Sequence, residues 1–501
     1  MKKRSILLLL LLSNTFTIKS ATEPTASKNT ANKEIQHNFD DIVFDWSGTF
    51  AEVLRTSGDK HYKIANPQEC IIKSINTFLN CLDPHSSFLD PKTYKAILEM
   101  TSGQFFGIGI VIDNTRSSKD KHLNVINTIP NGQAEKAGVK QYDKIIEIDG
   151  KKLEGMTTEE ATTKLRGEKG TKVAIKVLRE NKKAPLPFEI TRDVVKAQSS
   201  IAFYLKEHDI YYVSLSTFSN NAVKQIRDIL EKATKKSYKG LILDLRNNSG
   251  GLLNAVIDIA GLFLDKGSSV VITKDKHDKT MAEYKTTINP VANVDIPIFI
   301  LVNNYTASAS EILAGCLKVH SNDLSKKSKN GQKKLFTFIV GSKTFGKGSV
   351  QEVIPISNDC AIKLTTSLYF LPDDTTIQGK GIIPDFPIER LFPPPEKLVW
   401  FTKHYGREKT LKHSIKTNGT KNKKNKNEPK DKDKKTETWT ERLKKSLEKD
   451  NQFIETIRLI NVFNMVKQAN PSAINTREKA VAYLKNLFAL NGSLDMVEFK
   501  I

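Results

Sequence analysis

The chain has 501 residues, which is too long for one compact core and suggests roughly three folded units. Apolar residues make up 39% and charged residues 27%, a globular composition that excludes both a disordered polymer and a polytopic membrane protein. The 78 Lys and Arg residues against 56 Asp and Glu residues give a net charge of +22. Four cysteines are too few for a disulfide scaffold, and their spacings match no metal site.

The N-terminus has the layout of a secretory signal peptide. Lys2, Lys3 and Arg4 precede an apolar run that ends at Leu12, and small or polar residues follow. The run is about half of the roughly 20 residues that a membrane span needs, which disfavours an uncleaved anchor. We therefore expect a signal peptide over residues 1–20 and an exported protein, periplasmic or otherwise extracytoplasmic.

Two different patterns follow the signal peptide. Apolar residues at helical spacing predict an N-terminal helical region over residues 21–100. Cys70 and Cys81 flank one helical pattern there, so a bridge between them stays open, although unpaired cysteines are favoured. From residue 101 to 182 the signal changes to short strands. One helix in this unit begins at Thr157, where Thr at the cap and Glu three residues later form a capping box.

Strands and helices alternate between residues 183 and 392, which predicts a βαβ core around a largely buried sheet. The expected strands are 211–218, 240–245 and 298–302, and the expected helices are 222–233, 251–264 and 309–319. The expected fold class is therefore multidomain α/β, with helical regions at both ends of the chain.

A basic linker over residues 393–440 separates this core from a C-terminal helical region over 441–501, with helical patterns around 443–466 and 477–490. The stretch Lys409–Lys435 contains eleven Lys against three acidic residues and no Phe, Tyr or Trp. Because no aromatic residue is present to stack on bases, a solvated linker or contact with an anionic membrane surface is favoured over nucleic-acid binding. No nucleic acid is expected as a partner, and docking or assembly is the expected role of the C-terminal helices.

The first candidate for chemistry is the turn after strand 240–245, at Gly250-Gly251. Paired glycines let the backbone turn sharply and leave N–H groups unshielded at a helix start, where a phosphate or a transient oxyanion can bind. A plain tight turn is the simpler use of the pair, and from this segment alone it is favoured.

The second candidate is Ser308, which small residues flank between a strand and a helix. A nucleophile needs such a cramped turn so that a substrate carbonyl can approach it, as in the strand-to-helix elbow of other hydrolases. The N–H of Ala309 would then stabilise the oxyanion, together with that of Gly250 or Gly251. An N-cap serine is the ordinary alternative, and alone this segment favours it.

The third candidate is Lys347, within the segment Gly341–Gln351. This segment comes within one residue of a phosphate-binding loop. However, Gly348 replaces the Ser or Thr that holds magnesium, and the residues that follow are β-like, so the ATPase interpretation fails. Flanking glycines indicate close backbone approach and partial burial of Lys347. In an extended segment Gln351 points to the same face and can orient the amine.

None of these three segments contains His, which favours another base. A Lys amine ordinarily has a pKa of about 10.4, so it needs about 4 kcal/mol of bias toward its neutral form to act as a base near pH 7. Burial beside glycines and Phe345 is the physical way to supply this bias. Neutral Lys347 would accept the Ser308 proton and later protonate the leaving amine, by way of an acyl-enzyme that water hydrolyses.

Together these segments resemble the C-terminal processing, or tail-specific, peptidases, which are secreted serine proteases with a Ser–Lys dyad and an embedded PDZ domain. Six elements stand in the family's order: Leu82-Asp83-Pro84-His85-Ser86, a PDZ-like unit, Asp244–Gly251, Thr306–Glu311, Thr344–Gly348 with Gln351, and Gln378–Asp385. The resemblance implies a crotonase/ClpP-like protease core with an inserted PDZ domain. It also implies Ser308 as the nucleophile, Lys347 as the general base and Gln351 as the residue that orients the base. No cofactor and no metal are expected.

The unit over residues 101–182 resembles a PDZ domain, to which the C-terminal peptide of a substrate adds as another strand. The carboxylate-binding loop and edge strand would be Phe106-Gly107-Ile108-Gly109-Ile110. Arg166, just after the PDZ helix, would couple peptide capture to the protease core. An exposed charge at a helix end is the equally weighted alternative for this residue.

A few positions depart from the family pattern. Tyr142 occupies a turn where many PDZ domains have Gly, and Ser249 and Thr306 replace a common Pro and a common Ser. The gap between the two dyad residues is also longer than usual. The extra residues between Ser308 and Lys347 correspond to residues 321–334, a polar, Lys-rich segment that we expect to be a surface loop.

The expected function is that of an exported serine endopeptidase that recognises protein C-termini and cuts nearby. Its expected partners are protein substrates with accessible apolar C-termini, and a homo-oligomer is left open. One rival is a non-catalytic PDZ scaffold on a dead protease fold, against which the intact Ser308, Lys347 and Gln351 argue. The other rival is an enzyme of similar fold that acts on acyl thioesters, which predicts a nucleotide-binding groove and gives a PDZ unit no use.

Overall fold

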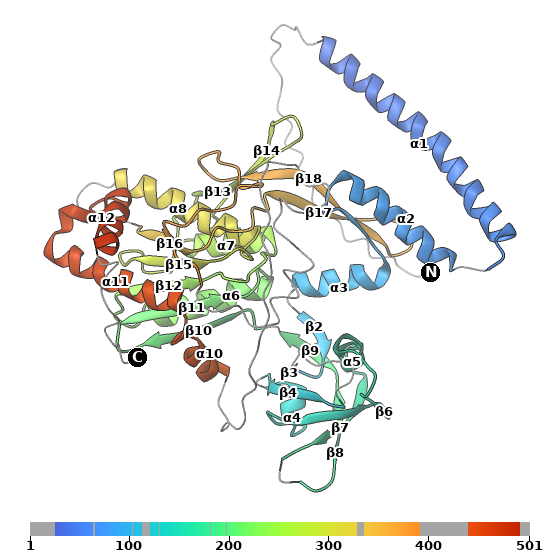
Figure 1. Ribbon diagram of the computed structural model, residues 1–501, viewed down its shortest axis with the longest axis horizontal. Coiled ribbons are helices and arrows are strands. Elements are labelled where there is room, and N and C mark those ends of the chain that lie inside the picture. Colours follow the sequence, from blue (N-terminus) through green and yellow to red (C-terminus); the bar gives the residue numbers. More distant parts are fainter. Residues whose placement is uncertain are drawn as a thin grey trace, which may run out of the picture. The chain divides into compact units, whose positions relative to one another are not determined.

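The computed structural model describes residues 26–63, 66–102, 104–112, 121–129, 131–180, 182–196, 198–327, 335–390 and 439–490 (Figure 1). The chain divides into two units, Met1–Ser74 and Ile75–Ile501. The expected signal peptide and nearly all of the basic linker lie outside the described residues. Within the described ranges, no helix is both long enough and apolar enough to cross a membrane.

The N-terminal region is helical, as predicted, and also contributes one short strand. Its elements are α1 (Ala26–Lys60), α2 (Pro67–Leu82), β1 (Ser87–Leu89) and α3 (Pro91–Ser102). Cys70 and Cys81 are both free and exposed on α2. At 1.5 Å per residue they lie about 16 Å apart, more than twice the longest Cα separation that a disulfide bridges. The bridge between these two cysteines is therefore excluded.

The predicted small β unit follows. Its elements are β2 (Gln104–Gly107), β3 (Ile110–Ile112), β4 (Leu123–Thr128), α4 (Gln133–Lys136), β5 (Lys144–Ile148), β6 (Lys151–Lys152), α5 (Thr158–Leu165), β7 (Lys172–Leu178), β8 (Leu186–Thr191) and β9 (Asp193–Lys196). The main sheet has the order β3-β4-β5-β7-β8, so β3 is an edge strand, while β2 pairs with β9. The capping box of Thr157 and Glu160 is present at the start of α5. Tyr142 has a φ of 69°, so its turn keeps the left-handed shape that Gly favours.

A six-stranded sheet forms the centre of the core. Its strands, in spatial order, are β10 (Ser200–Leu205), β11 (Ile210–Leu215), β12 (Gly240–Asp244), β15 (Ile298–Val302), β16 (Thr337–Gly341) and β19 (Phe386–Pro387). β10 is antiparallel to β11, and the other neighbours are parallel. Every residue of β12, β15 and β16 is buried, which confirms the predicted βαβ layout around a buried sheet.

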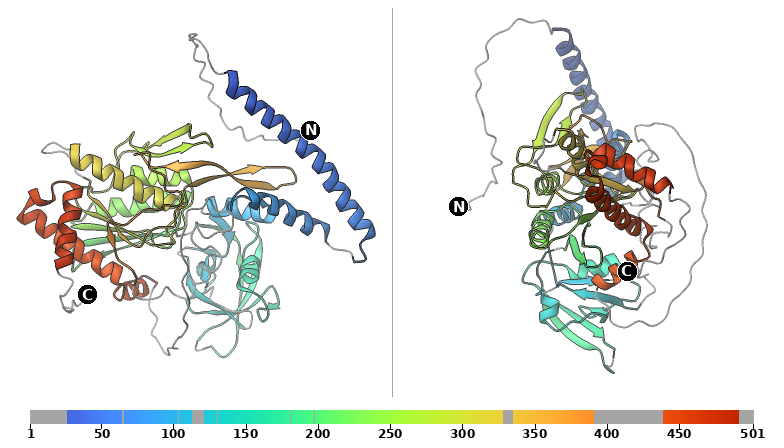
Figure 2. Two further views of the ribbon diagram at one scale, coloured as in Figure 1. Left: turned by 45° about the horizontal axis from the view of Figure 1, so that its top comes forward. Right: turned by 90° about the vertical axis from the view of Figure 1, so that its left-hand side faces the viewer.

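Helices from two distant parts of the chain cover the two faces of this sheet. They are α6 (Asn220–Ala233), α7 (Leu253–Gly261), α8 (Ala309–Lys327), α10 (Trp439–Leu447), α11 (Asn451–Ala469) and α12 (Arg477–Leu490). Leu243 and Ile300 pack with the first three helices, and Phe299 and Phe338 pack with the last three. The C-terminal helices, drawn in red, and the helix α8, drawn in yellow, can be followed in Figure 2. Alternate residues of each strand thus contact helices that precede and follow the basic linker.

The C-terminal helices are therefore part of the hydrophobic core, a role that the sequence did not predict. The ring of Phe463 on α11 lies 5.4 Å from that of Phe336 and 5.6 Å from that of Phe338, measured between centroids. The helical pattern around 443–466 is divided between α10 and α11. The division falls at Asp450, which caps α11 by accepting a hydrogen bond from the Phe453 N–H at 3.2 Å.

A second sheet combines strands from the N-terminal region and the core. Its other strands are β13 (Ser269–Lys274), β14 (Thr280–Lys285), β17 (Ser349–Pro355) and β18 (Ala361–Phe370). The long strand β18 pairs with β1, β13 and β17. Val350 is opposite Ser367 and Gln351 is opposite Thr365, so a bulge lies in β18 at Thr366, and such bulges re-aim the side chains beside them.

Helix α8 is longer than predicted. It runs to Lys327, so the first half of the segment 321–334 is helical rather than a surface loop. Ser321 is fully buried, and its Oγ donates to the Leu335 carbonyl at 2.8 Å and accepts from the Thr337 N–H at 2.9 Å. These two hydrogen bonds fix the residues at the start of β16 against α8. Residues 328–334 lie outside the described residues.

Candidate active site

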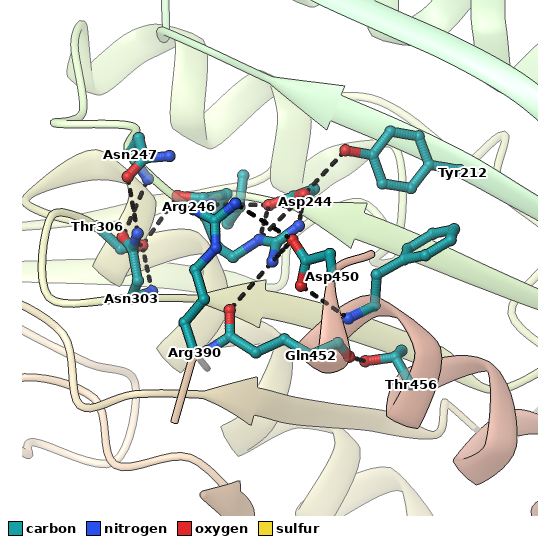
Figure 3. A network of polar contacts seen from close by, with 12 residues as sticks. Tyr212, Asp244, Arg246, Asn247, Asn303, Thr306, Arg390, Asp450, Gln452 and Thr456 are labelled. Carbon is teal, nitrogen blue, oxygen red and sulfur yellow. Dashed lines mark hydrogen bonds and ion pairs between the residues drawn. The ribbon is translucent and has the colours of Figure 1, made fainter. Parts of the chain in front are cut away.

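Two turns meet at the carboxyl end of the central sheet, because β12 and β15 are parallel neighbours. The turn after β12 carries Gly250 and Gly251, and the turn after β15 carries Ser308. The Asn247 N–H donates to Asn303 Oδ1 at 3.0 Å, and Asn303 Nδ2 donates to Asn247 Oδ1 at 2.7 Å (Figure 3). This reciprocal pair holds the two turns against each other.

Ser308 stands at the entry to α8 in a strained backbone conformation. Its φ is 55°, in the left-handed region that most residues avoid, and the residue is only 8% exposed. An N-cap serine has an extended backbone instead, so this geometry disfavours a plain cap. A strained strand-to-helix turn is the arrangement by which other hydrolases present a nucleophile.

Gly250 lies directly against the Ser308 turn. A Cβ at Gly250 would lie 2.9 Å from the Cβ of Ser308 and 3.0 Å from the nitrogen of Ala309, so this position has no room for a side chain. The Gly250 N–H donates to Asn248 Oδ1 at 2.9 Å within its own turn. Of the two glycines predicted to supply the second oxyanion donor, Gly251 is therefore the better candidate beside Ala309.

Glu311, in the first turn of α8, connects the predicted nucleophile to the predicted base. Its carboxyl group is fully buried. Oε2 accepts the N–H of Ser308 at 2.8 Å and the N–H of Lys347 at 2.9 Å. Oε1 accepts the Thr344 hydroxyl at 2.5 Å and the Gly346 N–H at 2.8 Å. The backbones of Ser308 and Lys347 thus meet at a single oxygen atom.

The pKa of the Glu311 carboxyl group is shifted from its ordinary value. Burial raises the pKa of Glu311 to about 7, although the hydrogen bonds from Thr344, Gly346, Ser308 and Lys347 act to lower it. The ionised form accepts from all four donors, whereas the protonated form must use one oxygen as a donor. The charge of Glu311 is therefore coupled to the order of the loop that carries Lys347.

Glycines let the Lys347 segment approach a neighbouring loop closely, as the sequence suggested. A Cβ at Gly348 would lie 2.6 Å from the nitrogen of Gln378, whose Oε1 accepts the Gly348 N–H at 2.7 Å. Gly346 has a φ of 94°, and its carbonyl accepts the Gly379 N–H at 2.8 Å. Lys347 itself is half-buried.

Gln351 lies on β17, opposite Thr365 of β18. Its Nε2 donates to Ser349 Oγ at 2.8 Å and to Thr365 Oγ1 at 3.3 Å. Both bonds use the nitrogen of the side-chain amide. An amine held by Gln351 would therefore be bound at Oε1.

The predicted peptide-binding residues gather around one groove of the β unit. A cavity of about 140 Å³ lies between the edge strand β3 and helix α5. Its walls include Gly107, Ile108, Gly109, Ile110, Ile112, Thr162, Leu165 and Arg166. Phe106 lies on β2, where it pairs with Val194 of β9 and is partly exposed. Arg166 caps α5 and forms an ion pair with Glu99 of α3 at 3.8 Å.

A buried ionic network connects the turn after β12 to the C-terminal helices (Figure 3). Arg246 Nη2 pairs with Asp244 at 2.6 Å, and Arg246 Nη1 pairs with Asp450, the cap of α11, at 2.7 Å. Arg246 Nη1 also donates to Gln452 Oε1 at 3.0 Å. The Tyr212 hydroxyl donates to Asp244 Oδ2 at 2.8 Å, and burial followed by the Asp244 charge raises the pKa of Tyr212.

The sequence pattern identified the residues of the motifs but missed the groups that hold them. Glu311 stood inside a motif without a role, although a carboxylate in the first turn of a helix is a recognisable signal. Asp450 carried no signal at all, because its partner Arg246 lies on the far side of the basic linker. Among the described residues, no cluster of three or more potential metal ligands occurs.

The chain is similar to known processing proteases. A model of peptidase family S41 matches residues 209–388, and a PDZ domain model matches residues 95–178. A carboxy-terminal-processing protease of Bartonella bacilliformis is 33% identical over 385 residues, 76% of this chain and 83% of that protein. A carboxyl-terminal-processing protease of Synechocystis sp. is 34% identical over 322 residues, 63% of this chain and 70% of that protein. A solved photosystem II D1 C-terminal processing protease is 27% identical, covering 67% of this chain and 86% of that chain with a TM-score of 0.38.

Proposed function

The chain belongs to peptidase family S41, the carboxy-terminal processing proteases with a PDZ domain, and on that premise we propose that it captures the C-terminal tail of a protein and hydrolyses a peptide bond nearby. It is a serine-type peptidase of mixed α/β fold. The parts of this proposal that go beyond the family are the Ser–Lys dyad, the capture of the tail and the export of the chain.

The observation that carries the dyad is the meeting of Ser308 and Lys347 at Glu311 Oε2. In the proposed reaction the neutral Lys347 amine takes the proton of Ser308 Oγ while that oxygen attacks the scissile carbonyl. The N–H groups of Ala309 and Gly251 stabilise the tetrahedral oxyanion. The protonated amine then gives its proton to the leaving nitrogen, and water hydrolyses the acyl-enzyme.

The groove beside β3 supports tail capture. Because β3 is an edge strand, a substrate tail can add to it through main-chain hydrogen bonds while side chains enter the cavity. Ile108 and Leu165 give this cavity an apolar lining, which suits an apolar C-terminal residue. The ion pair of Arg166 with Glu99 gives a route by which an occupied groove could influence residues outside the β unit.

Further parts of the proposal concern fold and location. A parallel sheet built by βαβ units, with a nucleophile at a strand-to-helix turn, supports a crotonase/ClpP-like core. The charged and apolar runs at the N-terminus support export to the periplasm or another extracytoplasmic site. The eleven Lys residues of Lys409–Lys435 support contact with an anionic membrane surface. Exposed apolar residues on α1, such as Phe44 and Trp46, support assembly into a homo-oligomer.

The dyad is tested with an unfolded protein substrate that ends in apolar residues. We expect Ser308→Ala and Lys347→Ala each to abolish cleavage, because one lacks the nucleophile and the other the base. Lys343→Ala is the matched control, since Lys343 is exposed in the same segment, and it should cleave like the wild type. An acylating probe should label Ser308 in the wild type. Cleavage by Ser308→Ala or by Lys347→Ala would contradict the proposed dyad. If the wild type neither cleaved the substrate nor reacted with the probe, a peptide-binding scaffold would be favoured.

A further inference from the structure

The motif Leu82–Ser86 has no part in the proposed reaction, yet its side chains are held in a defined arrangement. Asp83 Oδ1 accepts the N–H of His85 at 2.7 Å and the N–H of Ser86 at 2.9 Å, and Asp83 Oδ2 accepts the Ser86 hydroxyl at 2.5 Å. Ser86 is 1% exposed. An Asp that only capped a surface turn would have no reason to bind a buried hydroxyl as well.

Ser86 reaches a strand far away in the sequence. Its Oγ accepts the Thr365 N–H at 3.1 Å while it donates to Asp83. The strand after the motif, β1, pairs with β18 in the register Ser87 to Lys363. The turn formed by Asp83 and Ser86 is therefore fixed against the part of β18 that contains Thr365.

Thr365 in turn contacts Gln351. The two residues are opposite one another where β17 pairs with β18, directly after the bulge, and Gln351 Nε2 donates to Thr365 Oγ1 at 3.3 Å. Asp83 and Ser86 thus hold the backbone N–H of Thr365, and the side chain of the same residue contacts Gln351.

The charge of Asp83 gives these hydrogen bonds a direction. Burial acts to raise the pKa of Asp83, but hydrogen bonds from Ser86, His85 and Thr365 hold it below its ordinary value, so the group is ionised at neutral pH. An ionised carboxylate can only accept, so the Ser86 hydroxyl donates to Asp83, and Ser86 Oγ is left to accept the Thr365 N–H. Thr365 is thereby held in place, and its Oγ1 accepts from Gln351 Nε2, so the amide nitrogen points toward Thr365 and the amide oxygen away from it.

We propose that Asp83, with Ser86 and Thr365, is a positioning residue for the peptidase reaction. It fixes the side-chain amide of Gln351 so that Oε1 accepts a hydrogen bond from the Lys347 amine and directs the lone pair of that amine to Ser308. This inference rests on the proposed roles of Lys347 and Gln351. It gives the motif Leu82–Ser86 a chemical function at a site to which it contributes no reacting atom.

The decisive variant is Thr365→Val, which keeps the shape of the side chain but lacks the hydroxyl. We expect kcat on a short unstructured peptide to fall about tenfold, the effect of losing one hydrogen bond to a polar group, with KM unchanged. The acid limb of the pH profile of kcat should also move to lower pH. An acceptor stabilises the protonated Lys347 amine more than the neutral one, so its loss lowers the pKa of the amine. Thr365→Ser should restore both values.

We call the contacts that connect Asp83, Ser86, Thr365 and Gln351 the relay. Two further variants distinguish an effect of the relay from general damage to the fold. Asp83→Asn removes the charge that holds the Ser86 hydroxyl, and through it the Thr365 backbone, and should reproduce both effects of Thr365→Val. Asp90→Asn is the matched control, because Asp90 caps α3 through the Thr93 N–H at 2.7 Å without belonging to the relay, and it should behave like the wild type. Thermal unfolding of each variant shows whether a loss of kcat merely follows a loss of folded protein.

Failure of the relay can be told from failure of the proposed function. If Lys347→Ala or Gln351→Ala kept full activity, the proposed mechanism would be wrong and the relay with it. If both lost activity while Thr365→Val matched the wild type in kcat and in the acid limb, only the relay would be overturned. A lower kcat with an unmoved acid limb and no rescue by Thr365→Ser would also overturn it, because that result indicates a structural role alone.

Discussion

At the scale of single residues, the active site depends on a carboxyl group that takes no part in the proposed chemistry. Glu311 binds the backbone at Ser308 and Lys347 through one oxygen, and Thr344 and Gly346 through the other. A buried group that makes four hydrogen bonds fixes two loops at once. A donor that moved away from the carboxyl group would lose its acceptor inside the protein, where water does not replace it. The positions of Ser308 and Lys347, the proposed dyad, are thus set by main-chain contacts to Glu311.

The raised pKa of Glu311 predicts a pH dependence of stability. Between the ordinary value of 4.5 and about 7, the unfolded chain has this group ionised while the folded chain keeps it protonated. The free energy of unfolding should therefore fall as pH rises through this window, by about 3 kcal/mol, and stay constant with respect to this group above it. Urea denaturation from pH 4.5 to 8 measures the change.

Glu311→Gln removes this titration and is the comparison for that experiment. The variant should show a flatter pH profile than the wild type, whereas Glu352→Gln, at an exposed position on β17, should keep the wild-type slope. Parallel profiles for the wild type and Glu311→Gln would contradict the assignment of the window to Glu311.

At the scale of elements, apolar runs and glycine turns predicted the centre of the fold. The strand 298–302 and the start of α8 at Ala309 occur where the pattern indicated, because a buried parallel strand reads as a continuous apolar run. The pairing of β18 with β1 was not predicted, since it depends on contacts between residues more than half the chain apart, such as Ser87 and Lys363. The same distance concealed the contact of Ser86 with Thr365.

The candidate site shows the same contrast between features encoded locally and contacts made by distant residues. Ser308, Lys347 and Gln351 could be proposed from the sequence because residue type and local spacing carry the chemistry expected of them. Glu311 was not given its role, because its partners at Thr344 and beyond come from another part of the chain and local sequence holds no record of them. Motifs thus suggest candidate reacting residues, and only the fold reveals which residues hold them.

The salt bridge between Arg246 and Asp450 predicts a large loss of stability when it is broken. Both side chains are almost fully buried, so Asp450→Ala leaves a buried guanidinium with one carboxylate fewer and also uncaps α11. We expect a loss of about 3 kcal/mol in the free energy of unfolding, measured by urea denaturation. Asp228→Ala, at an exposed position on α6, is the control and should change stability little. Equal stability of the two variants would show that the network contributes nothing.

At the scale of the whole molecule, the basic linker separates two parts of one hydrophobic core. Arg390, the last described residue before the linker, lies 3.7 Å from Asp450 at the start of α11. The two ends that the linker joins therefore do not need a long connection. The sheet face that contains Phe299 and Phe338 is covered by α11 and α12, so those helices are required for the core and the length of the linker is not.

Deleting Lys409–Lys435 should leave the free energy of unfolding and the cleavage of a soluble substrate unchanged. The roughly 20 residues that remain can span up to about 65 Å, far more than the nine residues of α10 occupy. The same deletion should reduce binding to vesicles that contain anionic lipid, measured by co-sedimentation at low and high salt. Unchanged vesicle binding would remove the proposed membrane contact, and a fall in stability would show that the linker takes part in the core.

The dependence of the central sheet on α11 and α12 also affects the order of events during synthesis. A ribosome makes Ser308 and Lys347 before it makes the helices that cover Phe299 and Phe338. Until those last helices emerge, the aromatic face stays open to solvent and Arg246 lacks one of its carboxylates. The growing polypeptide therefore cannot complete the central core until α11 and α12 have been made, and a stop codon within the linker yields a product that quality-control proteases should remove.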